Sequence, residues 1–353
     1  MSKSLLVTGA AGFIGANFVH YWRSQYPDDR IVVFDALTYA GNRANLASLE
    51  GTDGFYFVHA DICDYDTVLA TLREHAVDTL VHFAAESHVD RSITGPDAFI
   101  ETNVVGTHSL LKAAREYWLG GEAKLPHRFH HVSTDEVYGS LASDAPGFYE
   151  EQKYEPNSPY SASKAASDHL VRAYLHTYGL QVTTSNCSNN YGPYHFPEKL
   201  VPLCLTNILR GLPLPVYGDG SNIRDWLFVA DHCRGIEKVL LDGVVGETYN
   251  IGGNNEWNNL DIVHLLCEQM DARFAADSSL AQRFPDSPCA GDGSARDLII
   301  FVEDRAGHDW RYAIDASKIS SELGYEPAET FETGLSKTLD WYLANEDWWR
   351  PLL

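Results

Sequence analysis

The chain has 353 residues, of which 44% are apolar and 12% aromatic, and its formal charge at pH 7 is −23. This apolar content is enough for one large or two moderate domains with a buried core. The charge argues against nucleic acid or an anionic membrane surface as a partner, and no stretch has the length and apolarity of a membrane span.

The N-terminal segment MSKSLLVTGAAGFIG has a short apolar run that stops at Gly9. A secretory signal needs a longer apolar region followed by a small-residue cleavage site. Six scattered cysteines without a C-x-x-C pair indicate neither a disulfide framework nor a zinc site. We therefore expect the run to be a first strand, the cysteines to be reduced and the protein to be cytoplasmic.

Short apolar runs alternate with segments of helical periodicity in the first half of the chain. The predicted strands are Leu5–Thr8, Ile31–Asp35, Phe55–Asp61, Thr79–Ala84, Phe129–Thr134 and Val182–Asn186, and the predicted helices lie near 13–24, 64–75, 97–118 and 160–178. This alternation predicts right-handed βαβ crossovers. The expected fold class is α/β, with a Rossmann-type doubly wound parallel sheet covered by helices on both faces.

Glycine and proline become dense after about residue 190, in stretches such as NNYGPYHFPEK and GLPLPVYGDGS. Such turn-rich sequence predicts a smaller, less regular C-terminal lobe. We expect a first domain over 1–187 and a substrate-binding lobe over 188–353, with some segments of the lobe returning to the first domain. Residues 271–297 are predicted to be an exposed insertion.

Glycines at positions 9, 12 and 15 follow the first strand and open a helix. Such glycines allow a tight turn, close approach of a pyrophosphate and close helix–strand packing. The G-x-x-G-x-x-G spacing meets the common dinucleotide fingerprint only in part. Asp35, at the end of the second strand, is placed to accept hydrogen bonds from ribose hydroxyls and would repel a 2′-phosphate. Together these features predict a site for NAD and not for NADP.

The stretch YSASK places Tyr160 and Lys164 four residues apart, on one face of a predicted helix. A phenol has a pKa of about 10 and is a poor base at neutral pH. A nearby ammonium and a positively charged nicotinamide would favour the phenolate. The same pair also occurs on ordinary surface helices, so it indicates catalysis only together with an NAD-binding half.

The stretch STDEVYG puts Thr134, Asp135 and Glu136 at the end of the fifth predicted strand, where open α/β sheets bind their ligands. The alternative is a solvated turn in which Asp135 caps a helix or bonds its own backbone. His130 and His131, earlier on this strand, point to opposite faces, so we predict no metal site there. The position of the acids at a central strand end favours a ligand site.

Several of these motifs carry a family resemblance. The turn TGAAGFIG, the YSASK helix and the hydroxyl on the preceding strand resemble the extended short-chain dehydrogenase/reductase family. The stretches AAESHVDRS, STDEVYG, SNNYGPYHFPEKL, YGDGSNIRDW and DRAGHDWRY resemble the dTDP-glucose 4,6-dehydratases, in the family's order from about residue 4 to 345. The Asp–Glu pair is the most specific element, because related epimerases tend to have small residues there and GDP-mannose dehydratases tend to keep only the Glu.

The resemblance implies a lyase of deoxysugar biosynthesis that keeps NAD bound and converts dTDP-glucose to dTDP-4-keto-6-deoxyglucose. Oxidation at C4 would be followed by loss of water across C5–C6 and return of hydride to C6. By resemblance, Tyr160 with Lys164 would take the O4 proton and Thr134 would orient O4. Glu136 would remove the C5 proton while Asp135 protonates the 6-hydroxyl. A homodimer is also implied, through the helices near 103–118 and 161–178.

Binding residues follow from the same resemblance, position by position. On the cofactor side they are Gly9, Gly12, Gly15, Phe13 and Ile14 in the turn, Asp35, Ala36, Leu37 and Thr38 at the adenosine ribose, Asp61 and Ile62 at the adenine, and Ala84, Ala85, Thr102, Tyr160, Lys164 and Asn190 toward the nicotinamide. On the substrate side they are Ser87, Thr134 and Asn189 at the hexose or phosphate, Lys199, Leu200, Pro215 and Tyr217 at the nucleoside, and Arg224, Asn259, Arg305 and His308 at the diphosphate and ribose. Ala306 departs from the family, which has Pro there.

Other functions remain as alternatives. A sugar-nucleotide 4-epimerase shares the fold but needs no acid pair, and another sugar-nucleotide 4,6-dehydratase would differ only in substrate. A non-catalytic NAD-binding regulator would be expected to have lost some of the catalytic groups.

Overall fold

The computed structural model describes residues 2–122, 124–304 and 309–353. Within them, seven parallel strands form one sheet in the order β10-β6-β5-β4-β1-β2-β3. Their bounds are β1 Ser4–Thr8, β2 Arg30–Asp35, β3 Phe55–His59, β4 Thr79–His82, β5 Arg128–Thr134, β6 Val182–Cys187 and β10 Thr248–Ile251. The predicted doubly wound parallel sheet is thereby confirmed.

Helices cover both faces of this sheet, so both of its faces are buried. Leu5 and Val7 of β1 belong to one core and Leu6 to the other. The first core is closed by α1 (Phe13–Gln25), α8 (Val229–Asp242) and α11 (Ser317–Leu323), and the second by α2 (Tyr65–Glu74), α5 (Thr107–Leu119) and α6 (Pro159–Tyr178). Strands β1 and β2 therefore read as near-continuous apolar runs, whereas β6 carries mostly buried polar side chains.

Local sequence sets both ends of α6. Ser158 and Ser161 form a reciprocal capping box, and Pro159 occupies the first helical position. Gly179 ends the helix in the left-handed conformation at φ 76°. Tyr160 consequently lies in the first turn, beside the carboxyl end of β5.

The periodicity near 97–118 predicts a helix, and the structure has unbroken helical backbone there, although its middle part is a π-helix. Short helices α3 (Val89–Thr94) and α4 (Asp97–Phe99) lead into a π-helical segment, Ile100–Gly106, before α5 begins. Asn103, in the π segment, bonds the backbone N–H and C=O of Glu86 and the hydroxyl of Ser163. These tertiary bonds, which periodicity cannot report, accompany the π turn.

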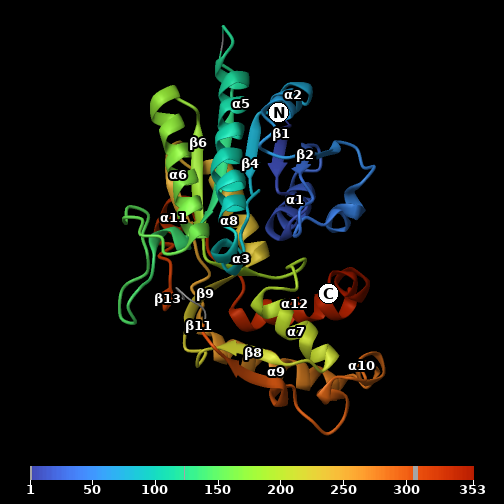
Figure 1. Cartoon of the computed structure of the whole chain (residues 1–353). Coiled ribbons are helices and arrows are strands. Elements are labelled where there is room, and N and C mark those ends of the chain that lie inside the picture. Colours follow the sequence, from blue (N-terminus) through green and yellow to red (C-terminus); the bar gives the residue numbers. More distant parts are fainter. Residues whose placement is uncertain (1, 123, 305–308) are drawn as a thin grey trace.

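The rest of the chain forms a C-terminal lobe with its own apolar core, below the large sheet in Figure 1. Its helices are α7 Leu200–Arg210, α9 Asn259–Ala276, α10 Ser279–Arg283, α12 Phe331–Ala344 and α13 Glu346–Trp349. Its strands are β7 Asn189–Tyr191, β8 Leu214–Tyr217, β9 Ile223–Phe228, β11 Glu256–Asn258, β12 Ile299–Val302 and β13 Arg311–Tyr312. No helix in the described ranges is both long and apolar enough to cross a lipid bilayer.

Residues 271–297, predicted to be an exposed insertion, are exposed at more than half of their positions but also contribute to the core of the lobe. Helix α9 runs on to Ala276, α10 follows, and Leu280 and Phe284 are buried in the core of the lobe. Asp271 accepts hydrogen bonds from the Ser294 hydroxyl at 2.6 Å and the Ala295 N–H at 2.9 Å. The apolar residues of the segment 271–297 are too widely spaced along the chain to predict this packing from the sequence.

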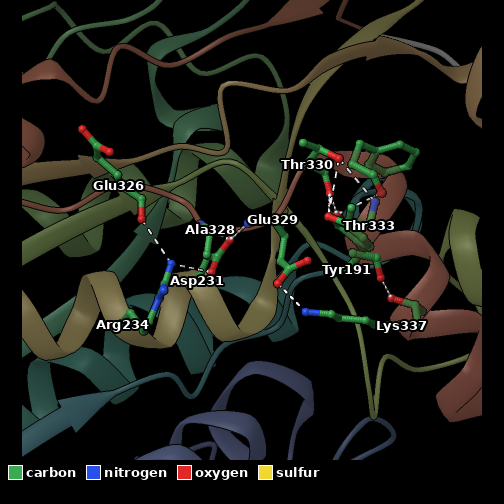
Figure 2. Close-up of polar contacts among 12 residues, drawn as sticks. Tyr191, Asp231, Arg234, Glu326, Ala328, Glu329, Thr330, Thr333 and Lys337 are labelled. Carbon is green, nitrogen blue, oxygen red and sulfur yellow. Dashed lines mark hydrogen bonds and ion pairs between the residues drawn. The ribbon is translucent and has the colours of Figure 1, made fainter.

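The segment before α12 is fastened to α8, as Figure 2 shows. Oδ2 of buried Asp231, on α8, accepts the backbone N–H groups of Ala328 and Glu329, each at 3.0 Å. Arg234 bonds Oδ1 of Asp231 at 2.7 Å and the carbonyl of Glu326 at 3.1 Å. The helix that covers the large sheet thus also fixes the start of a lobe helix.

Candidate active site

A cavity of about 500 Å³ lies between the carboxyl ends of the large sheet and the C-terminal lobe. Of the site residues that were predicted from the sequence and that the structure describes, all line it except Leu37. Leu37, at φ 51°, packs its side chain against the apolar core, and its backbone N–H donates to the Asp35 carboxylate. Arg305 and His308, like Ala306, lie outside the described residues.

The glycine turn packs so closely against neighbouring backbone that two of its positions have no space for a side chain. A Cβ on Gly9, at φ +66°, would lie 2.5 Å from the Ala84 nitrogen, and one on Gly15 would lie 2.4 Å from the Gly9 oxygen. Gly12 precedes α1 without any side-chain cap, so the first N–H groups of this helix face the cavity. This cradle fits the pyrophosphate of a dinucleotide.

Asp35 supports the same cradle from the end of β2. Its Oδ2 accepts the Ala11 N–H and its Oδ1 the Leu37 N–H, both at 2.8 Å. Burial raises the pKa of Asp35, and these two N–H groups act against that shift. The carboxylate therefore holds the turn in shape and keeps acceptor lone pairs toward the cavity, which fits the ribose hydroxyls of NAD.

Tyr160 and Lys164 both line the cavity from α6. The Lys164 ammonium donates to the Val132 carbonyl of β5 at 2.8 Å. Burial, with smaller contributions from Glu136 and Cys187, raises the pKa of Tyr160 well above its usual value, while a hydrogen bond with Thr134 acts against this. The desolvation of Tyr160 thus outweighs the lowering of its pKa that was expected from the Lys164 ammonium, and the protonated phenol is favoured.

Thr134, Asp135 and Glu136 stand where β5 runs into a short 3₁₀ helix, Asp135–Tyr138. The Thr134 hydroxyl accepts the Glu136 N–H at 3.3 Å, so Thr134 caps this helix and the alternative that Asp135 does so is wrong. The Asp135 side chain is only 1% exposed, and its Oδ2 has no hydrogen-bond partner among the residues that the structure describes.

The protonation of Asp135 follows from these surroundings. Burial first, then the charges of Glu136 and Asp225, raise the pKa of Asp135 well above its usual value, and Arg224 acts against them. These surroundings therefore favour the neutral, protonated form of Asp135. Glu136, half-buried beside it, lines the same cavity. One hydroxyl, one carboxylic acid and one further carboxyl group thus meet beside Tyr160.

The lobe supplies cations and amides to the far side of the cavity. Arg224 is 5% exposed, donates to the carbonyls of Ile223 at 2.7 Å and Asp309 at 2.9 Å, and stacks over the Tyr312 ring. Lys199, which directly precedes α7, donates to the carbonyl of Ser87 at 3.2 Å. These cations give an otherwise acidic protein a local positive field for a diphosphate.

Several further residues line the cavity although sequence reasoning did not assign them a role. His195 stacks on Phe13 with ring centroids 4.2 Å apart, and burial lowers the pKa of His195 to about 3. Other unassigned lining residues include Tyr39, Glu86, His88, Ser188, Glu198 and Trp226. Most of these stand inside the quoted motifs AAESHVDRS and SNNYGPYHFPEKL, so the motifs themselves carried the signal.

Comparison with known proteins places this geometry in a family. A model of the family described as GDP-mannose 4,6 dehydratase matches residues 6–338. A dTDP-glucose 4,6-dehydratase of Xanthomonas campestris is 57% identical over 99% of this chain and 95% of its own length, and one of Escherichia coli is 52% identical over 99% and 96%. The crystal structure of DesIV, a dTDP-glucose 4,6-dehydratase of Streptomyces venezuelae with NAD bound, matches with a TM-score of 0.88 at 48% identity, covering 99% of this chain and 100% of that one.

The same fold is also found in proteins of lower sequence identity. A UDP-glucose 4-epimerase of Thermotoga maritima has a TM-score of 0.82 at 24% identity, covering 98% of this chain and all of that one, which shows the shared fold alone. The two dehydratases, by contrast, are 57% and 52% identical to this chain over 99% of its length, so their likeness includes the sequence as well as the fold. The chain therefore belongs to the dTDP-glucose 4,6-dehydratases, within the extended short-chain dehydrogenase/reductase family.

Proposed function

We propose that the protein is a hydro-lyase that holds NAD and converts dTDP-glucose to dTDP-4-keto-6-deoxyglucose. The observation that carries this proposal is the buried, neutral Asp135 beside Glu136 at the end of β5, within the cavity that Tyr160 also lines. Oxidation or epimerisation alone needs no such acid pair. When bound, NAD supplies the oxidation at C4 and the reduction at C6, so the sugar undergoes no net redox change.

The first task of the chain is to remove the O4 proton. Tyr160 is the base, because it lies in the first turn of α6 and shares a hydrogen bond with Thr134. Thr134 at the same time orients O4. Lys164, four residues along the same face, supplies the positive charge that stabilises the phenolate.

The second task is to eliminate water across C5–C6. Hydroxide is a very poor leaving group, and the ketone at C4 makes the C5 proton acidic enough to be removed. Glu136 removes this proton, and Asp135, which burial keeps protonated, delivers its own proton to the 6-hydroxyl. The proton on Glu136 is then available for return to C5 when C6 is reduced.

The substrate is held by the opposite wall of the cavity. Lys199, Arg224 and the first turn of α7 provide charge and N–H groups for the diphosphate. Pro215 and Tyr217 of β8 border the nucleoside. Asn189, whose Oδ1 has no hydrogen-bond partner among the described residues, is placed to bond the hexose.

Mass spectrometry of the reaction tests the proposal. The purified protein is incubated with a panel of nucleotide-hexoses and no added reductant. Loss of one water from dTDP-glucose is the expected result. An unchanged mass with a galactose isomer formed would identify an epimerase, water loss only from another sugar nucleotide would identify a different 4,6-dehydratase, and no turnover of any sugar by NAD-loaded protein would identify a regulator.

We also propose that two copies associate through α5 and α6 and act in the cytoplasm. Exposed apolar side chains on and near these helices, Val105 and Tyr178 among them, support the pairing, and six free cysteines suit a reducing compartment. Light scattering should give about twice the chain mass, and Val105→Asp should convert the protein to monomers. A parent protein that is monomeric at micromolar concentration would exclude this pairing.

A further inference from the structure

A buried carboxyl group lies behind the catalytic pair and outside the cavity lining. Asp168, on α6, is 6% exposed and follows Lys164 by four residues. Tyr160, Lys164 and Asp168 thus repeat at a spacing of four along one stripe of the helix, facing β5. An isolated buried carboxylate costs free energy, so its partners decide what it does.

Asp168 has two hydrogen-bond partners outside its own helix, and one imidazole lies beside it. Its Oδ2 accepts the Ser133 hydroxyl at 2.9 Å, and the Tyr154 hydroxyl donates to the same carboxyl group. Nε2 of His131 lies 3.0 Å from Oδ1. Lys164 bonds Val132 and Asp168 bonds Ser133, so two neighbouring residues of β5 bind two side chains of the α6 stripe. Thr134 follows directly, so this fixes the catalytic stripe against the catalytic strand end.

Charge also connects Asp168 with Lys164. Burial raises the pKa of Asp168 to about 6, and Lys164 is the largest influence in the opposite direction. Burial lowers the pKa of Lys164, and Asp168 is the largest influence against that. Burial also drives the pKa of His131 well below its usual value, so this imidazole is neutral. The carboxylate of Asp168 therefore favours the charged form of Lys164 against the effect of burial.

The other titratable groups facing this pair come from every element around it. They are His131 on β5, His82 on β4, Cys187 on β6, Tyr154 in the loop before α6, His169 and Tyr160 on α6 itself, and Asp135 and Glu136 beyond the end of β5. Burial keeps the histidines of β4 and β5 and the cysteine neutral. None of the neutral groups can substitute for the carboxylate as a counter-charge.

We propose that Asp168 is a positioning residue for the oxidation step, the counter-ion that keeps Lys164 charged and aimed at the Tyr160 phenol. This inference rests on the proposed function. Without the carboxylate, Lys164 would lose its proton at a lower pH, because burial lowers the pKa of Lys164 and Asp168 is the largest influence against burial. A neutral Lys164 no longer stabilises the phenolate, so the removal of the O4 proton would slow.

The test uses full-length, NAD-loaded Asp168→Asn with dTDP-glucose. We expect kcat to fall by about tenfold or more with KM nearly unchanged, as for a general-base step made less favourable. The alkaline limb of the kcat profile should move to lower pH, and the deuterium isotope effect with substrate labelled at C4 should increase. Asp168→Glu should recover part of the loss.

Asp231→Asn is the matched control, because it makes the same change at a buried carboxyl group that does not line the cavity. It should leave the pH profile and the isotope effect at parent values. A parent-like pH profile and isotope effect in Asp168→Asn would overturn the inference.

If Asp168→Asn does not fold, Ser133→Ala replaces it. The Ser133 hydrogen bond lowers the pKa of Asp168, so its loss should move the alkaline limb in the same direction by a smaller amount, and no movement would overturn the inference. Failure of the parent to release water from dTDP-glucose would instead refute the proposed function.

Discussion

Asp135 and Glu136 are neighbours in sequence, yet the structure gives them different environments. Asp135 is enclosed and Glu136 is half-buried in the cavity wall. A neutral carboxyl group is favoured where water is excluded and a like charge is near, so the proton resides on Asp135. Two adjacent acids can therefore act as an acid and a base in one elimination.

Asp135→Asn should separate the two halves of the elimination. The amide cannot give a proton to the 6-hydroxyl, while Glu136 can still remove the C5 proton, so water loss should fall by about 10²–10⁴-fold. Exchange of the C5 proton in deuterated water, followed by mass, should fall much less. Glu136→Gln is the paired variant and should abolish the exchange. An equal fall of water loss and exchange in Asp135→Asn would mean that Asp135 is not the acid.

The pH dependence of water loss should report the same carboxyl group. Asp135 acts when protonated, and its pKa in the folded chain is raised above the usual value of 3.8. Water loss should therefore be retained at neutral pH and decline only as the pH rises through the raised pKa. Rapid-quench single turnovers at a series of pH values measure this. A decline already complete between pH 4 and 5 would contradict the assignment.

At the scale of the element, the turn between β1 and α1 depends on backbone that carries no side chains. Gly9→Ala would combine a left-handed φ of +66° with a Cβ 2.5 Å from the Ala84 nitrogen, in a neighbouring strand's extension. We expect stability to fall by about 1–3 kcal/mol or more and NAD to be lost during gel filtration. The NAD content of the purified variant is the measurement.

Gly51→Ala provides a matched control for this change. Gly51 has a similar φ of +77° but nothing within 4 Å of an added Cβ. It should cost only the backbone strain, of order 1 kcal/mol, and retain NAD. If Gly9→Ala also retains NAD at the parent level, the turn is not the pyrophosphate cradle.

At the scale of the whole molecule, the two lobes must keep a fixed relation, because the cavity has one wall from each. Asp231 contributes to this by binding two backbone N–H groups ahead of α12 (Figure 2). Asp231→Ala removes both hydrogen bonds, and because Ala328 is exposed and Glu329 half-buried, each loss should cost about 0.5–1.5 kcal/mol. The urea midpoint, measured at saturating NAD, should drop accordingly.

The exposed Asp53 provides the comparison for this loss. Asp53→Ala should change the free energy of unfolding by no more than about 0.5 kcal/mol. A urea midpoint for Asp231→Ala equal to that of Asp53→Ala would show that the contact does not hold the lobes together.

Local sequence was sufficient for the parallel sheet, the glycine turn and the first turn of α6. Apolar runs, glycine spacing and the Ser158–Pro159 cap act within a few residues, so their structural meaning can be read without the fold. The acid pair and its neighbours were found by motif, and the cavity indeed brings together all the predicted residues that the structure describes except Leu37.

Tertiary structure alone decided the rest. The π segment before α5 accompanies the distant bonds of Asn103, and 271–297 is ordered by burial in a core formed by other segments. The protonation of Asp135 and the mutual effect of Lys164 and Asp168 on each other's pKa depend on how completely water is excluded, which residues far apart in the chain determine. Sequence specified which groups are present, and packing specified their charge, because desolvation is a property of the assembled fold.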